Sequence, residues 1–264
     1  MSVVSQAKLA IIGGTGELGF GLAVRWAQAG VPILIGSRET AKARDAAERV
    51  VQKLKGAATG NREQGIEPAL SLPKGNRQQT EAEGSSRESS TLSVSGFENA
   101  QAAAQANVVV LTVPFPAQVP ILKSIRGALK ECIFVDATVP LAATLGGKAT
   151  RILHVWQGSA AEQTREFVPA AIPVLAAFHN LSAEALQDPA VALDCDILVC
   201  GDDEPAKQKL FPLIKLIDGL RPIDAGPLEM ARIVESLTAL LISLNRRYKV
   251  DHCGIRITGL NPVP

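Results

Sequence analysis

The sequence has few cysteines, and their spacing excludes the common cysteine-based sites. Four occur among 264 residues, with no C-x-x-C pair among them: Cys132, Cys195, Cys200 and Cys253. A zinc ribbon or a redox dithiol needs such closely spaced pairs. We therefore expect reduced, mostly buried thiols, as in a cytoplasmic protein.

Histidines and long apolar runs are also scarce, and charge is nearly balanced. The three histidines are too scattered in the sequence to indicate a metal site, so no metal is expected. The formal net charge of +1 gives no reason to expect nucleic acid or an anionic membrane as a partner. No uninterrupted apolar run approaches the roughly 20 residues that cross a bilayer. The first residues, MSVVSQAK, lack the pattern of a signal peptide, so we expect a cytoplasmic protein without a membrane partner.

Glycine, by contrast, is concentrated in one informative stretch, KLAIIGGTGELG at residues 8–19. An apolar run, Leu9–Ile12, is followed by Gly14, Gly16 and Gly19 in the spacing G-x-G-x-x-G, and an apolar periodic segment begins at once. Strand, tight turn and helix in this order are the context of a dinucleotide-binding fingerprint. We expect Gly14 to turn the chain, Gly16 to admit a pyrophosphate and Gly19 to let the helix pack on the strand. The alternative is a glycine-rich turn that binds no nucleotide.

The residues after the second expected strand, Val31–Ile35, favour NADP over NAD. A free ribose 2′-hydroxyl is usually bound here by Asp or Glu, whereas a 2′-phosphate favours Arg. Ser37 and Arg38 offer a hydroxyl and a planar fork of donors to phosphate, while Glu39 favours NAD. The alternative is a solvated, basic helix start.

The middle of the chain predicts two more strands that end alike. The strands at Val108–Val113 and Cys132–Asp136 end alike, with the tripeptide T-V-P at residues 112–114 and 138–140, which suggests two loops lining one cofactor groove. Between the helix expected at 41–55 and Phe97 the composition is polar and lacks periodicity. We expect an insertion there, at about residues 57–95, as a mobile surface loop or weak hairpin.

The last third predicts short strands and one long helix. A strand at Val174–Phe178 ends at His179, and further strands are expected at Ile197–Cys200 and Leu220–Asp224. The aspartates at 202 and 203 are interpreted as helix caps rather than catalytic acids. Residues 228–247 form the longest helical pattern, and its apolar surface predicts a two-fold homodimer.

Several motifs together resemble one family over nearly the whole chain. They read GGTGELGFGLA, IGSR, VVLTVPF, VDATVP, AAFHNL, CGDDEPAKQ, DGLRPIDAGPLE and RIVESLTALL. They are similar to the NADPH-dependent coenzyme F420 reductases, or F420:NADP oxidoreductases. The resemblance implies an α/β fold: a Rossmann-type doubly wound parallel sheet at residues 1–172, followed by a smaller C-terminal α/β domain at 173–264 that binds the acceptor and dimerises.

The resemblance also implies a division of roles among the site residues. His179 and Thr238 would be catalytic, lying near the deazaflavin and nicotinamide rings with Leu181. Together with Leu181, the expected cofactor-binding residues are Gly14, Thr15, Gly16, Glu17, Leu18, Gly19, Ser37, Arg38, Thr112, Val113, Pro114, Thr138 and Val139.

The implied reaction is direct hydride transfer between the nicotinamide C4 of NADP(H) and the C5 of coenzyme F420, which acts as a small-molecule substrate. The cofactors carry this chemistry, so the protein needs only to hold the rings in contact and exclude water. Two alternatives stay open. One is a reductase of the same fold acting on a flavin, an imine or a carbonyl compound, and the other is a non-catalytic NADP-binding sensor.

Overall fold

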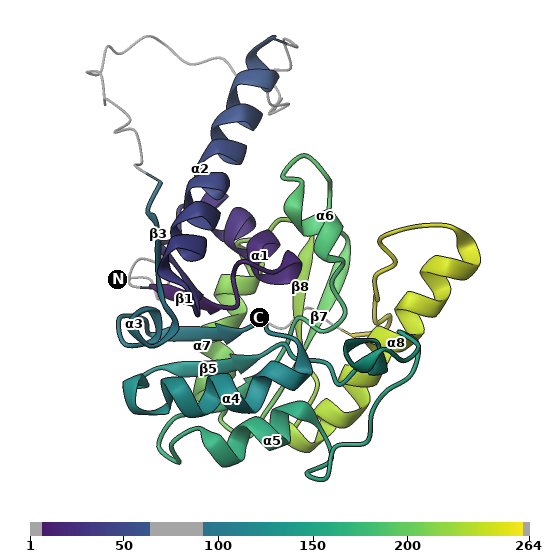
Figure 1. The fold of residues 1–264 in the computed structure, drawn as a ribbon. Coiled ribbons are helices and arrows are strands. Elements are labelled where there is room, and N and C mark those ends of the chain that lie inside the picture. The colour runs from purple at the N-terminus through teal and green to yellow at the C-terminus, as the bar shows by residue number, and fades with distance from the viewer. Residues whose placement is uncertain (1–6, 64–91, 261–264) are drawn as a thin grey trace, which may run out of the picture.

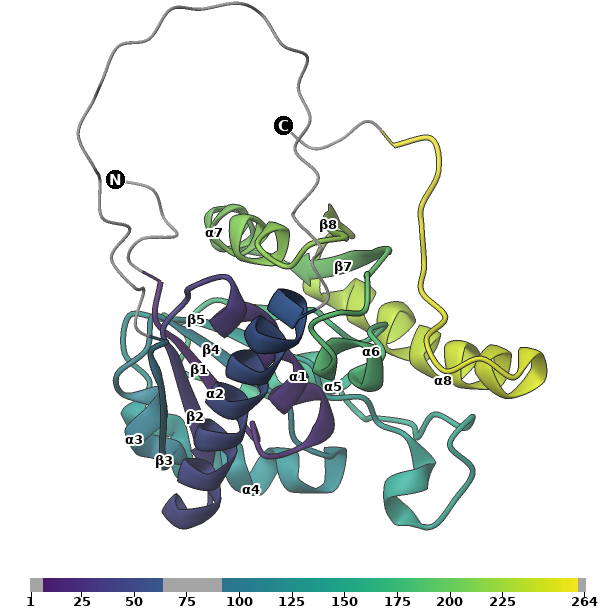
Figure 2. The same ribbon diagram turned by 90° about the horizontal axis from the view of Figure 1, so that it is seen from above.

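The computed structural model describes residues 7–63 and 92–260. Within these ranges one sheet has the strand order β3-β2-β1-β4-β5-β6-β7-β8 (Figures 1 and 2). The strands are β1 Leu9–Ile12, β2 Ile33–Ser37, β3 Val94–Glu98, β4 Val108–Leu111, β5 Ile133–Asp136, β6 Val174–Ala176, β7 Cys195–Gly201 and β8 Leu220–Asp224. All neighbouring pairs are parallel except β6 and β7. Because strand order reverses at β1, this is the predicted Rossmann-type, doubly wound sheet.

Helices cover both faces of this sheet, as Figure 1 shows for α1 and α2 on one side and α4 and α5 on the other. The helices are α1 Glu17–Gln28, α2 Thr40–Glu63, α3 Asn99–Ala103, α4 Phe115–Ile125, α5 Ala160–Phe167, α6 Ala183–Gln187, α7 Glu204–Lys215 and α8 Ala231–Tyr248. Successive strand residues point to opposite faces. Accordingly, Leu9 and Ile11 pack in one buried cluster, and Ala10 and Ile12 pack in the other. Burial on both sides explains why the strands are continuous apolar runs.

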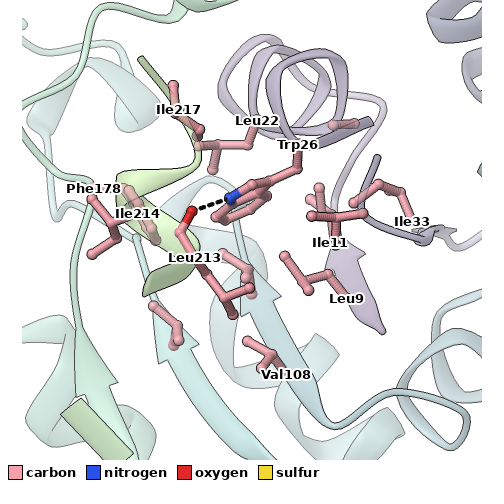
Figure 3. Close-up of a cluster of buried hydrophobic side chains, with 14 of the residues drawn as sticks. Leu9, Ile11, Leu22, Trp26, Ile33, Val108, Phe178, Leu213, Ile214 and Ile217 are labelled. Carbon is pink, nitrogen blue, oxygen red and sulfur yellow. Dashed lines mark hydrogen bonds between the residues drawn. The ribbon is translucent and has the colours of Figure 1, made fainter. Parts of the chain in front are cut away.

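Trp26 on α1 lies at the centre of the first cluster (Figure 3). Its indole Nε1 donates to the Leu213 carbonyl oxygen at 2.8 Å, and its ring meets Phe178 edge to face, with centroids 5.5 Å apart. Leu213 belongs to α7 and Phe178 follows β6. This cluster therefore joins the glycine-rich N-terminal region to the last third of the chain.

The polar stretch interpreted as an insertion is partly regular structure. Helix α2 runs to Glu63 rather than residue 55, and β3 begins at Val94 and pairs with β2. The polar composition of this stretch did not predict β3, because β3 depends on backbone pairing with β2 and on the close approach of α2. A Cβ at Gly96 would collide with the α2 backbone at Ala43 and Arg44. The rest of the expected insertion, residues 64–91, lies outside the described residues.

One of the two expected helix caps is confirmed. Asp203 caps α7 by accepting the Ala206 N–H at 2.8 Å, as predicted. Asp202 does not cap α7; it accepts the Leu228 N–H at 3.0 Å and so joins the start of α7 to the segment before α8. The sheet continues through β6 across the expected domain boundary, so the division at residue 172 stays a prediction. Among the described residues, no helix is both long and apolar enough to span a membrane.

Candidate functional site

The glycine-rich loop is a compact turn between β1 and α1. Gly13 has φ +84° and donates its N–H to the Gly36 carbonyl at 3.1 Å. The Gly14 N–H returns to the Ile11 carbonyl at 3.2 Å, and the Gly16 N–H to the Gly13 carbonyl at 2.9 Å. The left-handed residue of this turn is Gly13, which immediately precedes the Gly14 turn that the sequence predicts. Glycine adopts this conformation without steric cost because it has no Cβ. Gly13 is the first residue of the GG pair and so the first residue of the turn.

The first turn of α1 is left open toward solvent. Gly16 is its N-cap and supplies no side-chain cap, while Thr15, Gly16 and Glu17 are all exposed. Gly19 allows the close approach that the sequence predicts, since a Cβ there would lie 2.8 Å from the Gly14 Cα and would also meet the Thr112 hydroxyl. Uncapped N–H groups at a helix N-terminus form a natural binding site for a phosphate.

A cleft of about 280 Å³ connects this loop to the ends of β2 and β4. It contains many of the predicted cofactor-binding residues and several others: Gly13, Thr15, Gly16, Ser37, Arg38, Glu39, Lys42, Asn99, Thr112, Val113, Pro114, Ala117 and Ile121. Strand β2 ends at Ser37, so Arg38 is the first residue beyond the sheet, and it is exposed to solvent. The cleft thus combines the open phosphate loop with a guanidinium suited to a second phosphate.

Two polar residues of this cleft were missed by sequence reasoning. Lys42 lies in the first turn of α2, and its Nζ is 2.6 Å from Glu39 Oε1. Asn99 is 2% exposed, and its side-chain oxygen has no partner among the described residues. Lys42 belongs to the stretch that the sequence indicates only as a basic helix start. Asn99 could be found only by recognising β3, whose carboxyl end places it beside the end of β2.

The remaining predicted cofactor residues lie outside this cleft. Gly14 and Gly19 are buried behind the loop, and Leu18 packs on the core. Glu17 faces a different cavity of about 620 Å³, lined also by α6 residues. At the end of β5, Thr138 donates its N–H to Asp136 Oδ1 at 2.6 Å, while its buried hydroxyl has no partner among the described residues. Val139, which follows, is half-buried.

The predicted acceptor residues meet through one hydrogen bond. Thr238 on α8 donates its hydroxyl proton to the His179 carbonyl at 2.7 Å, although the two residues are 59 positions apart. The Thr238 oxygen then retains only acceptor capacity toward any ligand. Leu181 is half-buried and packs at the margin of the Trp26 cluster. The structure therefore brings Thr238 and His179 together, but neither lines the cleft described above.

The His179 side chain is enclosed and unpaired. It is 3% exposed, and neither ring nitrogen has a hydrogen-bond partner within the described chain. Burial lowers the pKa of His179 to about 4, so the imidazole is neutral at physiological pH. A neutral imidazole has one donor and one acceptor nitrogen, which suits hydrogen bonding to an uncharged ring edge.

The buried carboxyl group of Glu235 joins α8 to α5. Glu235 accepts the N–H groups of Ala160 and Ala161 at 2.9 and 3.0 Å, capping α5 from α8. Burial raises the pKa of Glu235 to about 8 and that of Asp136 above its usual range. Since Glu235 lies three residues before Thr238 on α8, this contact also sets the height at which Thr238 meets His179.

The burial of His179 predicts a pH-dependent stability. The unfolded chain takes up a proton near pH 6.5, whereas folded His179 does so only near pH 4, so stability is lost as pH falls between these values. The contribution is on the order of 3 kcal/mol. Urea unfolding at pH 7 and pH 4.5 should show a smaller loss for His179→Gln than for the wild type. Equal losses in the two proteins would contradict the assignment.

Comparison with known proteins shows the family of this chain. A family model described as "NADP oxidoreductase coenzyme F420-dependent" matches residues 8–68 and 73–140. The F420-dependent NADP reductase of Methanothermobacter thermautotrophicus is 41% identical over 261 residues, 98% of each chain. The chain belongs to this family. A second member, the F420-dependent NADP reductase of Methanocaldococcus jannaschii, is 40% identical and covers 96% of this chain and 99% of its own.

Two solved structures share the fold of this chain. A structure from Arthrobacter sp. FB24 aligns with a TM-score of 0.70 at 22% identity, covering 96% of this chain and 99% of its own. An imine reductase from Myxococcus stipitatus aligns with a TM-score of 0.54 at 14% identity, covering 92% of this chain and 62% of its own. At these identities the likeness concerns the fold alone.

Proposed function

We propose that this protein transfers a hydride between NADP(H) and coenzyme F420. The observation that carries the proposal is the cleft in which an uncapped helix N-terminus, Ser37 and Arg38 meet, in a chain that matches the family over nearly its full length. The transfer between nicotinamide C4 and deazaflavin C5 is chemistry that the two coenzymes supply when bound. The protein's part is to bind, orient and exclude water.

The nucleotide half of the site follows from the cleft residues. The N–H groups of Thr15 and of the first turn of α1 would hold the pyrophosphate, and Arg38 with Ser37 would hold the 2′-phosphate. Thr112, Val113 and Pro114 form the wall at the end of β4. Lys42 can add a second cationic contact by turning from Glu39, because both side chains are largely exposed.

The acceptor half of the site would form around His179 and Leu181. Leu181 offers an apolar surface to a ring, and neutral His179 can donate or accept one hydrogen bond. Thr238 would act mainly by holding the His179 backbone. Together they would keep the reacting carbons about 3–3.5 Å apart, the separation needed for transfer. The division of the chain into a nucleotide domain at 1–172 and an acceptor domain at 173–264 is part of this proposal.

The experiment that tests the function compares acceptors directly. NADPH oxidation is followed with purified F420, FMN, a cyclic imine and a carbonyl compound at equal concentrations. We expect rapid NADPH oxidation with F420 and with none of the other three acceptors. Rapid oxidation with FMN, the imine or the carbonyl compound, and none with F420, would favour a reductase of another specificity. NADPH binding without oxidation of any acceptor would favour a sensor.

We further propose a cytoplasmic homodimer. Its four free cysteines fit a reducing compartment. The C-terminal half of α8 projects from the body (Figures 1 and 2). Ile233 and Leu240 are 55% and 53% exposed, and half-buried Leu237 and Leu244 complete a stripe at spacings of four, three and four. Such a stripe matches the seam of a helix pair formed by a second copy.

The dimer predicts a specific sensitivity to charge on α8. Leu240→Lys should convert the protein to a monomer, because an unpaired ammonium would be buried in the seam. Arg246→Glu, which changes the charge at an exposed position on another side of the same helix, is the control and should leave the mass unchanged. Light scattering at micromolar concentration measures both. A monomeric wild type would contradict the proposal.

A further inference from the structure

Helix α1 contacts two regions with different expected roles. Its N-terminal turn belongs to the glycine-rich loop, and one face of its middle packs against the segment at residues 178–191, which follows β6 and contains α6. This segment, called here the acceptor segment, includes His179 and Leu181. Gly21, Arg25 and Trp26 of α1 make close contacts with this segment, and Gln187 of the segment donates a side-chain N–H to the Glu17 carbonyl at 3.3 Å.

Arg25 binds the acceptor segment through backbone carbonyls. Its Nε donates to Leu186 at 3.0 Å, and its Nη2 donates to Ala185, Asp188 and Val191 at 2.6, 2.6 and 2.8 Å. A longer contact of 3.5 Å joins Nη1 to Pro189. The side chain is almost fully buried and leaves the carbonyls at the end of α6 satisfied. A lysine has a single ammonium and could not reach all of these oxygens at once.

Gly21 and Trp26 hold the same segment at α6 and at its first residue, Phe178. A Cβ at Gly21 would lie 2.6 Å from the Leu186 Cβ, so α6 rests directly on the α1 backbone. Trp26 packs edge to face on Phe178, which immediately precedes His179 and has φ +71° (Figure 3). A bulky residue keeps such a conformation only where its surroundings hold it. The fully buried ring of Phe178 is held in this way.

We propose that Gly21, Arg25 and Trp26 are positioning residues that hold the acceptor segment, and through it His179 and Leu181, at a fixed place relative to the nucleotide loop on the same helix. The inference rests on the proposed function. Its physical basis is that one rigid helix carries the phosphate-binding turn and the seat of the acceptor segment. Displacing the acceptor segment relative to α1 should therefore slow hydride transfer without weakening nucleotide binding.

The sharpest test uses a substitution that favours the helix. Gly21→Ala raises helix propensity but places a methyl group against Leu186. Gly56→Ala on α2 makes the same change where an added Cβ meets no atom within 4 Å, and serves as the matched control. Arg25→Lys is the second test variant, since it keeps the charge and loses the fork of donors.

Three measurements separate positioning from stability: NADPH affinity, single-turnover hydride transfer to F420, and amide hydrogen exchange of residues 178–191. For Gly21→Ala and Arg25→Lys we expect transfer to slow about tenfold, exchange in the segment to rise, and NADPH affinity to stay within about twofold. Gly56→Ala should match the wild type in all three. Unchanged exchange and transfer in both test variants, or parallel loss of NADPH affinity, would overturn the proposal. If wild-type protein fails to reduce F420, the proposed function is wrong. The exchange measurement still tests whether α1 holds the acceptor segment.

Discussion

NADPH binding is expected to weaken about 10- to 100-fold when Arg38 is replaced by alanine, while NADH binding changes little. Arg38 follows the last residue of β2, lines the cleft beside Ser37, and is engaged by no ion pair within the described residues. Its guanidinium is therefore available for a forked, charge-assisted pair with the 2′-phosphate. NADH lacks this phosphate, so removing the side chain costs it almost nothing.

Arg44→Ala is the matched control for this measurement. It removes the same charge from the start of α2, but Arg44 faces β3 rather than the cleft. Its effect should be limited to long-range attraction, less than about threefold at physiological ionic strength. Dissociation constants for both nucleotides, measured by quenching of protein fluorescence, decide the outcome. Equal weakening of NADPH and NADH by Arg38→Ala would refute a 2′-phosphate site at this residue.

Hydride transfer is expected to slow about 100-fold in His179→Ala with NADPH affinity nearly unchanged. The imidazole is buried, neutral and unpaired among the described residues, so its nitrogens are available to orient a ring. Thr238→Ala should slow transfer less, by about tenfold, because Thr238 acts through its hydrogen bond to the His179 carbonyl. The effects should not add in the double variant, since both changes disturb the same group.

Ser236→Ala controls for the loss of a hydroxyl from α8. Ser236 Oγ donates to the Arg232 carbonyl within the same helix and does not contact His179. Single-turnover rates should therefore match the wild type. If His179→Ala or Thr238→Ala instead lost NADPH binding while keeping its single-turnover rate, that residue would belong to the nucleotide site. Fully additive rate effects in the double variant would show that Thr238 acts independently of His179.

Some features of this protein followed directly from local sequence. The turn after β1 and the start of α1 depend on residues within a few positions of one another, so the glycine spacing predicted them correctly. Positive φ at Gly13 was not predicted, because the spacing places a turn at the GG pair without indicating which glycine is left-handed. Asp203 was likewise identified as a cap from its neighbours alone.

Other features depended on partners far away in the sequence. Strand β3 is stabilised by pairing with β2 and by the fit of α2 over Gly96, and neither appears in its polar composition. Asn99 entered the cleft only because that strand exists.

The sequence by itself predicted the glycine-rich turn, the start of α1 and the place of Ser37 and Arg38 after a buried strand, because turns, helix starts and strand burial depend on short-range patterns. The doubly wound sheet was predicted from the resemblance of several motifs to one family, and the structure confirms it. The tertiary structure alone decided that Thr238 holds the His179 carbonyl, that Glu235 caps α5, and that Arg25 holds the acceptor segment. Each of these contacts joins residues 59 to 166 positions apart. Such contacts form because burial forces polar groups to find partners, and the packing of helices on the sheet determines which partners are within reach.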